Sequence, residues 1–283
     1  MTDTFTKKQS SLKPSKRVTI IIGIGLTIGA LATAFPFIWM VTSSVKPQQE
    51  SVSYPPTIIT LHPTLSYFKE LFTQLDFGRY LLNTVAVVLI GFVGLFFIAM
   101  AGYAFAKFEF RGKGFMFFLV LATMMIPVQL TMIPTYLILS RIRLTNTLIG
   151  IAMPTLVSAF GIFLFRQFMS TLPSEIFEAA KLDGAGEWLI FLRVVIPMSM
   201  PIIAVQAVLT FIAGWNSFLW PLIIANDQNL YTLSVGLSLL NKQISANPSL
   251  EMAAATLMVL PILFVFMIFQ RFIVQGFALS GLK

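Results

Sequence analysis

Long apolar runs separated by short polar connections follow one another along the whole chain. Six of them come close to or exceed the ~20 residues that a helix needs to cross a hydrocarbon core about 30 Å thick. The predicted spans cover residues 18–44, 80–106, 115–140, 147–168, 196–225 and 252–269. The pattern therefore predicts an all-α, polytopic membrane protein with six transmembrane helices.

Lysine and arginine are divided unevenly between the connections. If the N-terminus is cytoplasmic, the connections on that side hold 13 of the 19 basic residues and those on the other side hold six. Cytoplasmic loops carry an excess of such residues, so the count predicts that both termini are cytoplasmic. Arg141 and Arg143 lie in a short predicted outer loop and run against this pattern, which leaves models with four or five spans open.

The predicted organisation follows from these spans. A cytoplasmic tail, 1–17, precedes a first transmembrane helix, 18–45, which is too long for the h-region of a signal peptide. A transmembrane core of five helices, 80–270, contains a cytoplasmic loop, 170–196, and a second cytoplasmic tail covers 271–283. We expect the proline-rich first outer loop to end in a short helix near 66–75, and the outer connection 225–251 to be polar enough to lie in water or against a partner.

Composition strengthens this picture and removes several classes of function. The chain is 57% hydrophobic and only 11% charged, against roughly 25% charged in a soluble domain. Its net charge of +8 is clustered beside apolar runs, so orientation in the membrane explains it and a nucleic-acid partner is not predicted. There is no cysteine, and the one histidine, His62, precedes a proline in a loop. We therefore expect no metal site and no cofactor.

Charge is also missing from the interior of the spans. Arg166 is placed near a span edge, and no other acidic or basic residue lies at predicted membrane depth. Such residues are costly and are kept for function, so their absence argues against a membrane enzyme and against proton-coupled transport. Gly112-Lys113 lacks the upstream glycine and the following Ser or Thr of a phosphate-binding loop. The chain is thus not expected to be an enzyme, and energy is expected from another subunit.

The loop between the fourth and fifth spans is predicted to form a helix, a sharp turn and a second helix. Pro173 and Ser174 suit a helix start, and Glu175 is placed where the helix dipole favours an acid. Asp183-Gly184 predicts the end, because glycine readily takes the left-handed conformation that closes a helix.

The first of these two helices has only about two turns and is marginal alone in water. The small side chains of Ala179 and Ala180 permit close approach by another element. The residues alone favour equally a helix that packs on its own subunit and one that docks on a partner.

The stretch EAAKLDGAGEWLIFLRVVIP, 178–197, resembles the cytoplasmic loop signature of bacterial ABC importer permeases. That signature is EAA, three residues, Gly, nine residues and I-x-L-P, and here its anchors are Glu178-Ala179-Ala180, Gly184, and Val194, Ile196 and Pro197. The resemblance covers nearly the whole chain and is closest to the carbohydrate-type permeases of the maltose-transporter family. Supporting stretches include NTVAVV, AGYAFAKFEFRGK and GWNSFLWPLIIANDQNLYTLSVGL, whereas the final ALSGLK departs from the family's usual ending.

The resemblance implies a permease subunit in a bacterial inner membrane, in contact with membrane lipid. Its implied partners are a second, homologous permease, two ATP-binding cassette ATPase subunits and an extracytoplasmic solute-binding protein. The implied ATPase-coupling residues are Glu178, Ala179, Ala180, Asp183 and Gly184, and the implied solute is a sugar or oligosaccharide. A permease for glycerol phosphate, polyamine or phosphate, and a membrane scaffold that does not transport, remain alternatives.

Polar residues near membrane depth give candidate positions for a solute path. They are Gln129, Gln206, Trp215, Asn216 and Ser217, and they lie in spans that prolines interrupt. Broken helices often line the path in transporters, although such prolines also serve packing alone. A tryptophan at a helix end is more often an interfacial anchor.

Overall fold

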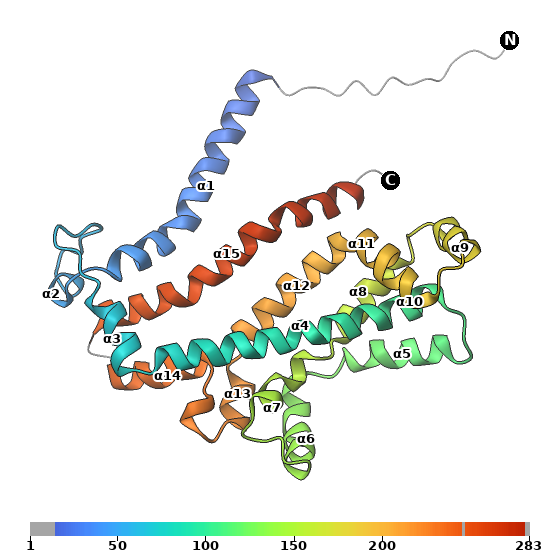
Figure 1. The fold of residues 1–283 in the computed structure, drawn as a ribbon. Helices are drawn as coiled ribbons and strands as arrows, with labels where there is room; N and C mark the ends of the chain where they lie inside the picture. The colour runs from blue at the N-terminus through green and yellow to red at the C-terminus, as the bar shows by residue number, and fades with distance from the viewer. Residues whose placement is uncertain (1–14, 245–246, 281–283) are drawn as a thin grey trace.

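The computed structural model describes residues 15–244 and 247–280, and every regular element in those ranges is a helix (Figure 1). Three helices are long and apolar enough to cross a membrane unbroken: α1 (Lys16–Ser43), α4 (Phe77–Lys107) and the part of α15 (Pro248–Ser280) that ends at Gln270. At 1.5 Å per residue α4 is about 46 Å long, more than a hydrocarbon core requires. The predicted all-α, polytopic fold is confirmed.

Three further candidate spans each consist of a pair of helices that meet at an angle. The axes differ by 103° between α5 (Lys113–Thr123) and α6 (Val128–Arg141). They differ by 44° between 148–155 and α8 (Ala159–Met169), and by 81° between 187–198 and α12 (Met200–Trp215). Six candidate spans result if each bent pair counts as one.

The remaining elements are short. They are α2 (Gln48–Ser51), α3 (Ser66–Gln74), α7 (Leu148–Ala152), the 3-10 turn η1 (Met153–Thr155), α9 (Ser174–Leu182), α10 (Glu187–Ile190), the π-helical turn η2 (Phe191–Val195), α11 (Ile196–Met198), α13 (Leu219–Ile224), the 3-10 turn η3 (Gln228–Leu230) and α14 (Leu233–Ile244).

Prolines lie at the bends, as the sequence predicted. The angles between the helix axes at these bends are larger than those of a proline kink within one helix. Pro127 immediately precedes α6 and has no N–H to continue the helix from α5. Pro197 and Pro201 flank Ser199, where the fifth span turns. The predicted spans 115–140 and 196–225 are therefore not single helices, and the second also breaks after Trp215, before α13.

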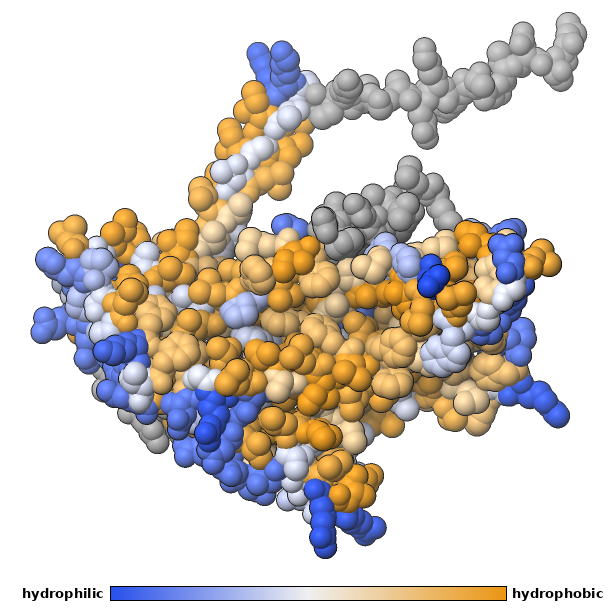
Figure 2. Space-filling model, viewed as in Figure 1, coloured by the Kyte–Doolittle hydropathy of each residue, from blue (hydrophilic) through white to orange (hydrophobic). Residues whose placement is uncertain are grey.

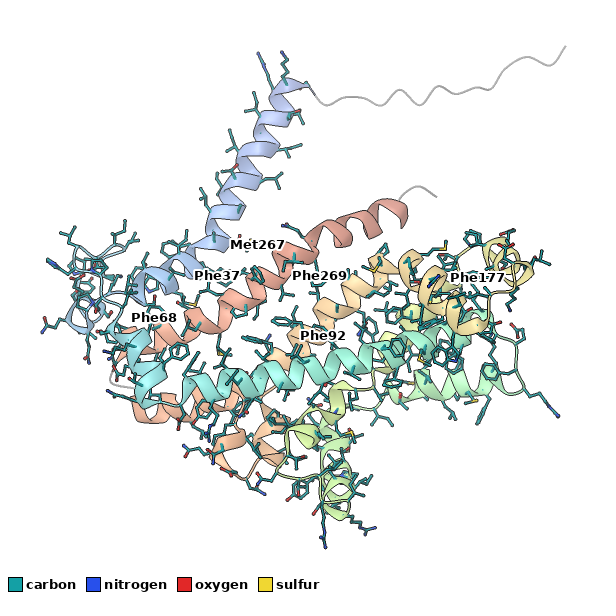
Figure 3. The ribbon with its side chains drawn as sticks, viewed as in Figure 1. Phe37, Phe68, Phe92, Phe177, Met267 and Phe269 are labelled. Atoms are coloured by element: carbon teal, nitrogen blue, oxygen red, sulfur yellow. The ribbon has the colours of Figure 1, made fainter. Side chains whose placement is uncertain are left out.

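Helix α4 is the centre of the molecule, with α8 and α12 packed along it. Glycines allow this approach: a Cβ on Gly102 would lie 2.3 Å from Phe165 Cβ, and one on Gly94 would lie 2.5 Å from the backbone of Leu156. Small residues serve this purpose at membrane helix contacts. In Figure 3 the ring of Phe92 points from α4 into the region between α4, α12 and α15.

Helix α1 leans away from this body and meets it only at its C-terminal end, beside the start of α15 (Figure 1). None of its apolar window is buried, and Ile21, Leu26 and Leu31 are each more than 60% exposed. The space-filling view shows apolar residues covering the middle of the molecule, with polar groups gathered toward its two ends (Figure 2). This is the surface expected of a protein embedded in lipid.

The connection 225–251, predicted to lie in water or against a partner, packs in part on its own chain. It contains α14, whose Leu233 and Val235 are fully buried against the body. Thr84 Oγ1 on α4 accepts a 2.8 Å hydrogen bond from the Leu233 backbone N–H, and Asn83 donates to the carbonyl of Tyr231. Buried partners far away in sequence thus fold a segment whose average polarity suggested a loop.

Two boundaries also differ. Helix α15 begins at Pro248 and continues to Ser280, beyond the predicted span 252–269 and into the predicted tail 271–283. Helix α1 begins at Lys16, within the predicted tail 1–17. The rest of these two tails, 1–14 and 281–283, lies outside the described residues. The short helix expected near 66–75 is confirmed as α3.

Candidate functional site

Helix α9 ends in the turn that the sequence predicts. Gly184 has a φ of +81°, and its N–H donates to the Lys181 carbonyl at 3.0 Å. The Ala185 N–H donates to the Ala180 carbonyl at 2.9 Å. These two bonds, with a left-handed glycine between them, form a Schellman motif that satisfies the last carbonyls of the helix. The helix therefore stops at a defined residue, and the chain leaves it in a defined direction.

The inner face of α9 is fixed to the body by one aromatic side chain. Phe177 is 7% exposed and belongs to the apolar cluster formed by α4, α8 and the start of the fifth span. Lys107, the last residue of α4, places its Nζ 5.0 Å from the centre of the Phe177 ring and donates to the Leu172 carbonyl at 2.6 Å. Figure 3 shows Phe177 pointing from α9 into this end of the body.

Glu187, at the start of α10, joins three elements across the Gly184 turn. Its Oε1 lies 2.6 Å from Lys181 Nζ on α9, and its Oε2 accepts a 3.5 Å hydrogen bond from the Tyr103 hydroxyl on α4. About half of each side chain in the ion pair is exposed, so the pair adds at most about 1 kcal/mol. The turn, Phe177 and Glu187 together hold α9 and α10 as one unit on the end of α4.

The outer face of α9 is exposed in the described chain. Of the five predicted coupling residues, Glu178, Ala179, Asp183 and Gly184 are exposed, and Ala180 is half-buried on the inner side. We name the exposed side formed by Ile176, Ala179, Leu182 and Asp183 the α9 outer face. These positions fall within one third of a helical turn when spaced at 100° per residue.

Two residues of this face were not singled out from the sequence. Ile176 is 39% exposed, and Leu182 is 89% exposed. The sequence signal that could have identified them is their spacing, because each lies three positions from Ala179 in an otherwise polar loop.

A second feature is a cavity of about 560 Å³ where the fourth and fifth spans break. We name it the mid-span cavity. It lies between the start of α6, the η1–α8 junction, α12 and α13. Its lining consists of Val128, Met132, Ile151, Pro154, Thr155, Val157, Ser158, Phe160, Gln206, Leu209, Thr210, Ala213, Ser217, Phe218, Leu219 and Trp220. Of the predicted solute-path residues it contains Gln206 and Ser217.

Gln206 is the most buried polar side chain of the cavity lining, at 3% exposed. Its Oε1 has no hydrogen-bond partner. A Cβ added to Gly161 of α8 would lie 3.1 Å from Gln206 Nε2, so the glycine makes room for the amide. An unpaired buried amide oxygen costs free energy, which makes it an unusual group to keep in a helix contact.

The other three predicted path residues lie elsewhere. Trp215 is 2% exposed, stacks on Phe211 at 5.2 Å between ring centres and donates its Nε1–H to the Met258 carbonyl on α15 at 3.0 Å. It is a packing residue between α12 and α15, neither part of the cavity lining nor an exposed interfacial anchor. Gln129 and Asn216 are exposed outside the cavity.

Trp220 was not singled out from the sequence, and it does line the cavity. Its Nε1–H donates to the Gly150 carbonyl at 3.1 Å.

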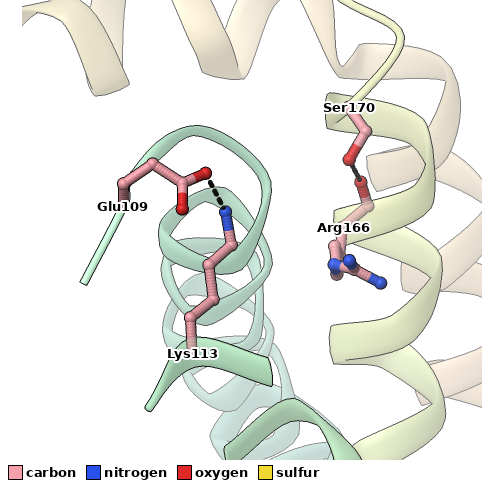
Figure 4. A network of polar contacts seen from close by, with 4 residues as sticks. All are labelled: Glu109, Lys113, Arg166 and Ser170. Atoms are coloured by element: carbon pink, nitrogen blue, oxygen red, sulfur yellow. Dashed lines mark hydrogen bonds and ion pairs between the residues drawn. The ribbon is translucent and has the colours of Figure 1, made fainter. Parts of the chain in front are cut away.

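Charged groups collect at the end of the body that carries α9. Lys113 pairs with Glu109 at 2.8 Å at the start of α5, opposite Arg166 and Ser170 at the end of α8 (Figure 4). The Arg166 guanidinium lies 3.9 Å from the centre of the Phe117 ring. Arg166 lies in the last turn of α8. Within 15–244 and 247–280 no group of three or more His, Asp or Glu side chains is placed to bind a metal ion.

Comparison with known proteins gives matches over nearly the full chain. Residues 98–278 match the family model described as "Binding-protein-dependent transport system inner membrane component". The arabinooligosaccharide transport permease AraQ of Halalkalibacterium halodurans is 31% identical, covering 96% of this chain and 99% of its own. The lactose permease LacG of Rhizobium radiobacter and the sn-glycerol-3-phosphate permease UgpE of Pectobacterium atrosepticum are each 34% identical, covering 89% of this chain and 92% of theirs.

The fold also has a solved counterpart. A chain of a bacterial ABC transporter that imports the acidic polysaccharide alginate superimposes with a TM-score of 0.80 over 96% of this chain, at 22% identity. The two chains thus share the same helical fold. Together, the family model over residues 98–278 and relatives above 30% identity show that the chain belongs to the binding-protein-dependent transport system inner membrane components, the permease family that its 178–197 signature resembles.

Proposed function

We propose that the chain is the permease subunit of an ATP-driven importer for a sugar or oligosaccharide. The observation that carries the proposal is the α9 outer face: Leu182 is 89% exposed on a helix whose other side and C-terminal turn are tied to α4 and α10. A short helix with an unpaired apolar side chain gains stability from packing on a partner. A partner on the α9 outer face is supported by the contrast between the inner face of this helix, which packs on its own chain, and its exposed outer face.

The partner on the α9 outer face is an ATPase subunit in this proposal, and ATP hydrolysis takes place there. This chain is then not an enzyme, and it needs no cofactor of its own. The assembly comprises two ATPase subunits, a second, homologous permease and an extracytoplasmic solute-binding protein. The end that carries α9 faces the cytoplasm of a bacterial cell, and the spans lie in its cytoplasmic membrane.

A continuous set of contacts leads from the α9 outer face toward the mid-span cavity. Movement of α9 is transmitted through the Gly184 turn and Glu187 to α10, and then through the π-helical turn η2 to the bend at Ser199. Helix α12 starts at this bend and carries Gln206. ATP binding favours the conformation in which the ATPases hold α9 more tightly, which links the state of the ATPases to the shape of the cavity.

Sugar is preferred as the solute because two of the named relatives are permeases for arabinooligosaccharides and for lactose. The similarly related glycerol-3-phosphate permease makes glycerol phosphate the second candidate solute. A scaffold that does not transport is disfavoured by the cavity with its buried amide at mid-span.

The test is purification of the tagged chain from its native membrane, followed by identification of what accompanies it. We expect an ATPase, a second permease and a solute-binding protein, and ATP-dependent uptake after reconstitution.

A charge reversal tests the α9 contact. Glu178→Lys reverses a charge beside the α9 outer face and is expected to abolish uptake with membrane insertion unchanged, measured by solute uptake and by the amount of inserted chain. Normal uptake in that variant would contradict the docking role of α9. If the purified chain is recovered without any ATPase, the importer proposal fails and the scaffold that does not transport becomes the favoured function.

A further inference from the structure

We propose that the chain binds the headgroup phosphate of an anionic phospholipid between Arg166 and Lys113, with the acyl chains of the lipid lying on the exposed apolar side of α5. We name the place formed by Lys113, Phe117 and Arg166 the α5–α8 site. The inference needs only that the chain spans a membrane. It is independent of the solute and of the docking role of α9.

Lys113 and Arg166 lie at the same end of two neighbouring helices. Lys113 is the first residue of α5, and Arg166 is in the last turn of α8, which packs beside α5. The Arg166 guanidinium lies 3.9 Å from the centre of the Phe117 ring, and Phe117 is four residues from Lys113. Residues four apart on a helix are neighbours on its surface, with Cβ atoms about 5–6 Å apart. The two cationic groups are therefore brought to the same side of α5 (Figure 4).

The guanidinium of Arg166 has no acidic partner in the described part of the chain. The ion pairs there are Lys113–Glu109 and Lys181–Glu187, and neither includes Arg166. The Arg166 Nε is buried without a hydrogen-bond partner. The Phe117 ring gives the guanidinium a cation–π contact but no acceptor in the plane of its N–H groups. A half-buried arginine in this state gains free energy from an anion with several acceptor oxygens, which a phosphate provides.

The local charge also favours an anion. Arg111, Lys113 and Arg166 contribute three positive charges and Glu109 contributes one negative charge, so the group has a formal net charge of +2. The Glu109 side chain is 88% exposed, and its 2.8 Å pair with Lys113 is of the surface kind that adds little stability. A phosphate can therefore replace Glu109 as the partner of Lys113 at small cost.

The surface beside these cations favours a lipid over a soluble anion. The outward side chains of α5 are large, apolar and between 46% and 66% exposed: Phe115, Met116, Phe118 and Leu119. Such a surface is stable against acyl chains and costs free energy in water. Basic pockets between membrane helices are a known type of site for anionic lipid headgroups. A soluble phosphate compound or an acidic protein segment at Arg166 would leave the apolar side of α5 uncovered.

A lipid in the α5–α8 site would support the platform on which α9 rests. The Ser170 hydroxyl donates to the Arg166 carbonyl at 2.7 Å, and the chain enters α9 four residues later, at Ser174. Phe165 of α8 is fully buried in the same apolar cluster as Phe177 of α9. Because the lipid phosphate bridges α5 and α8, we expect anionic lipid to raise the Tm of the chain.

Native mass spectrometry of the chain, purified in detergent with the subunits that accompany it, measures the binding. The probes are phosphatidylglycerol, phosphatidylcholine with the same acyl chains, and inorganic phosphate as a competitor. Arg166→Gln removes the charge, and we expect it to raise the Kd of the most tightly bound phosphatidylglycerol at least fivefold. The matched control is Arg141→Gln, which makes the same change of charge at the exposed end of α6 and leaves the Kd within twofold.

A second variant shifts the affinity in the opposite direction. Glu109→Gln removes the carboxylate that competes for Lys113, so we expect it to lower the Kd for phosphatidylglycerol at least twofold and to enlarge the rise in Tm that this lipid produces. Glu70→Gln, on α3, is its control and leaves the Kd unchanged. A variant with damaged folding does not bind the lipid more tightly, so a tighter Kd cannot come from loss of structure.

Each result has a defined consequence. An unchanged Kd in Arg166→Gln, no tighter binding in Glu109→Gln, or equal affinity for phosphatidylglycerol and phosphatidylcholine would overturn the site. Displacement of the lipid by excess inorganic phosphate would overturn the lipid assignment in favour of a soluble phosphate. Loss of an accompanying subunit from Arg166→Gln with the lipid Kd unchanged would overturn it in favour of a protein contact. None of these results decides the import function, which solute uptake tests separately.

Discussion

The α9 end and the mid-span cavity show two different ways in which this chain makes a working surface. The α9 unit is built from residues close together in sequence, with the Gly184 turn, the Lys181–Glu187 pair and Phe177 all inside 170–196. The cavity brings together side chains from three separate stretches of the chain, 128–132, 151–160 and 206–220, and no local signal marks it. One surface is convex and bears charge, and the other is a hollow lined by uncharged residues. The difference indicates that the shape of the α9 unit is encoded locally, whereas the mid-span cavity depends on how the broken spans pack.

The largest effect on uptake is expected from disrupting the Gly184 turn at the end of α9. Proline fixes φ near −65°, so Gly184→Pro is incompatible with the φ of +81° at this position and removes the N–H that bonds to Lys181. We expect uptake to fall by more than a hundredfold, with the chain still inserted in the membrane. Radiolabelled solute uptake in proteoliposomes is the measurement.

Gly186→Ala is the matched control for that change. Gly186 has a φ of −72° and open space where a Cβ would be added, so alanine is tolerated. Retained uptake in Gly184→Pro, or an equal loss in Gly186→Ala, would show that the turn does not set the direction of α9.

The next largest effect is expected from a charge on the α9 outer face. Leu182→Asp replaces an exposed apolar side chain that we assign to the ATPase contact, and it should weaken recovery of the ATPase with the tagged chain at least tenfold. Leu61→Asp is the control, because Leu61 is equally exposed at 89% but lies in the connection between α2 and α3, away from α9. Equal recovery of ATPase in the two variants, measured by quantitative mass spectrometry of the purified complex, would contradict the docking assignment.

The smallest effect concerns the link across the turn. Glu187→Gln removes the ion pair with Lys181 but keeps a side chain that can accept from Tyr103. Because both partners are about half exposed, we expect a two- to threefold loss of coupled uptake that added salt reproduces in the wild type.

A double-mutant cycle with Lys181→Met gives the interaction free energy of the Lys181–Glu187 pair. A value near zero would show that the ion pair does not help to hold α9 and α10 together. A value above about 2 kcal/mol would show instead that the pair is shielded from water in the assembled importer.

Local physics explains which parts were predictable. The bounds of α9 depend on Pro173 before its first residue, on charges that suit the helix dipole and on Gly184 after its end, and they appear where the sequence places them. Trp215 shows the limit. Its position at a helix end suggested a solute path or an interfacial anchor, but the neighbouring helix α15 supplies a carbonyl partner and buries it. No pattern around Trp215 indicates which helix it will face.

The amino-acid sequence by itself determined the membrane class, the helical spans and the α9 unit, because apolar run length, caps and turns act over a few residues. Only the tertiary structure decided how sharply the spans bend, that α14 is buried, that Trp215 packs on α15 and that Gln206 faces a cavity without charge. These depend on contacts between residues far apart in the chain, and the free energy of such contacts is set by the packing of whole helices.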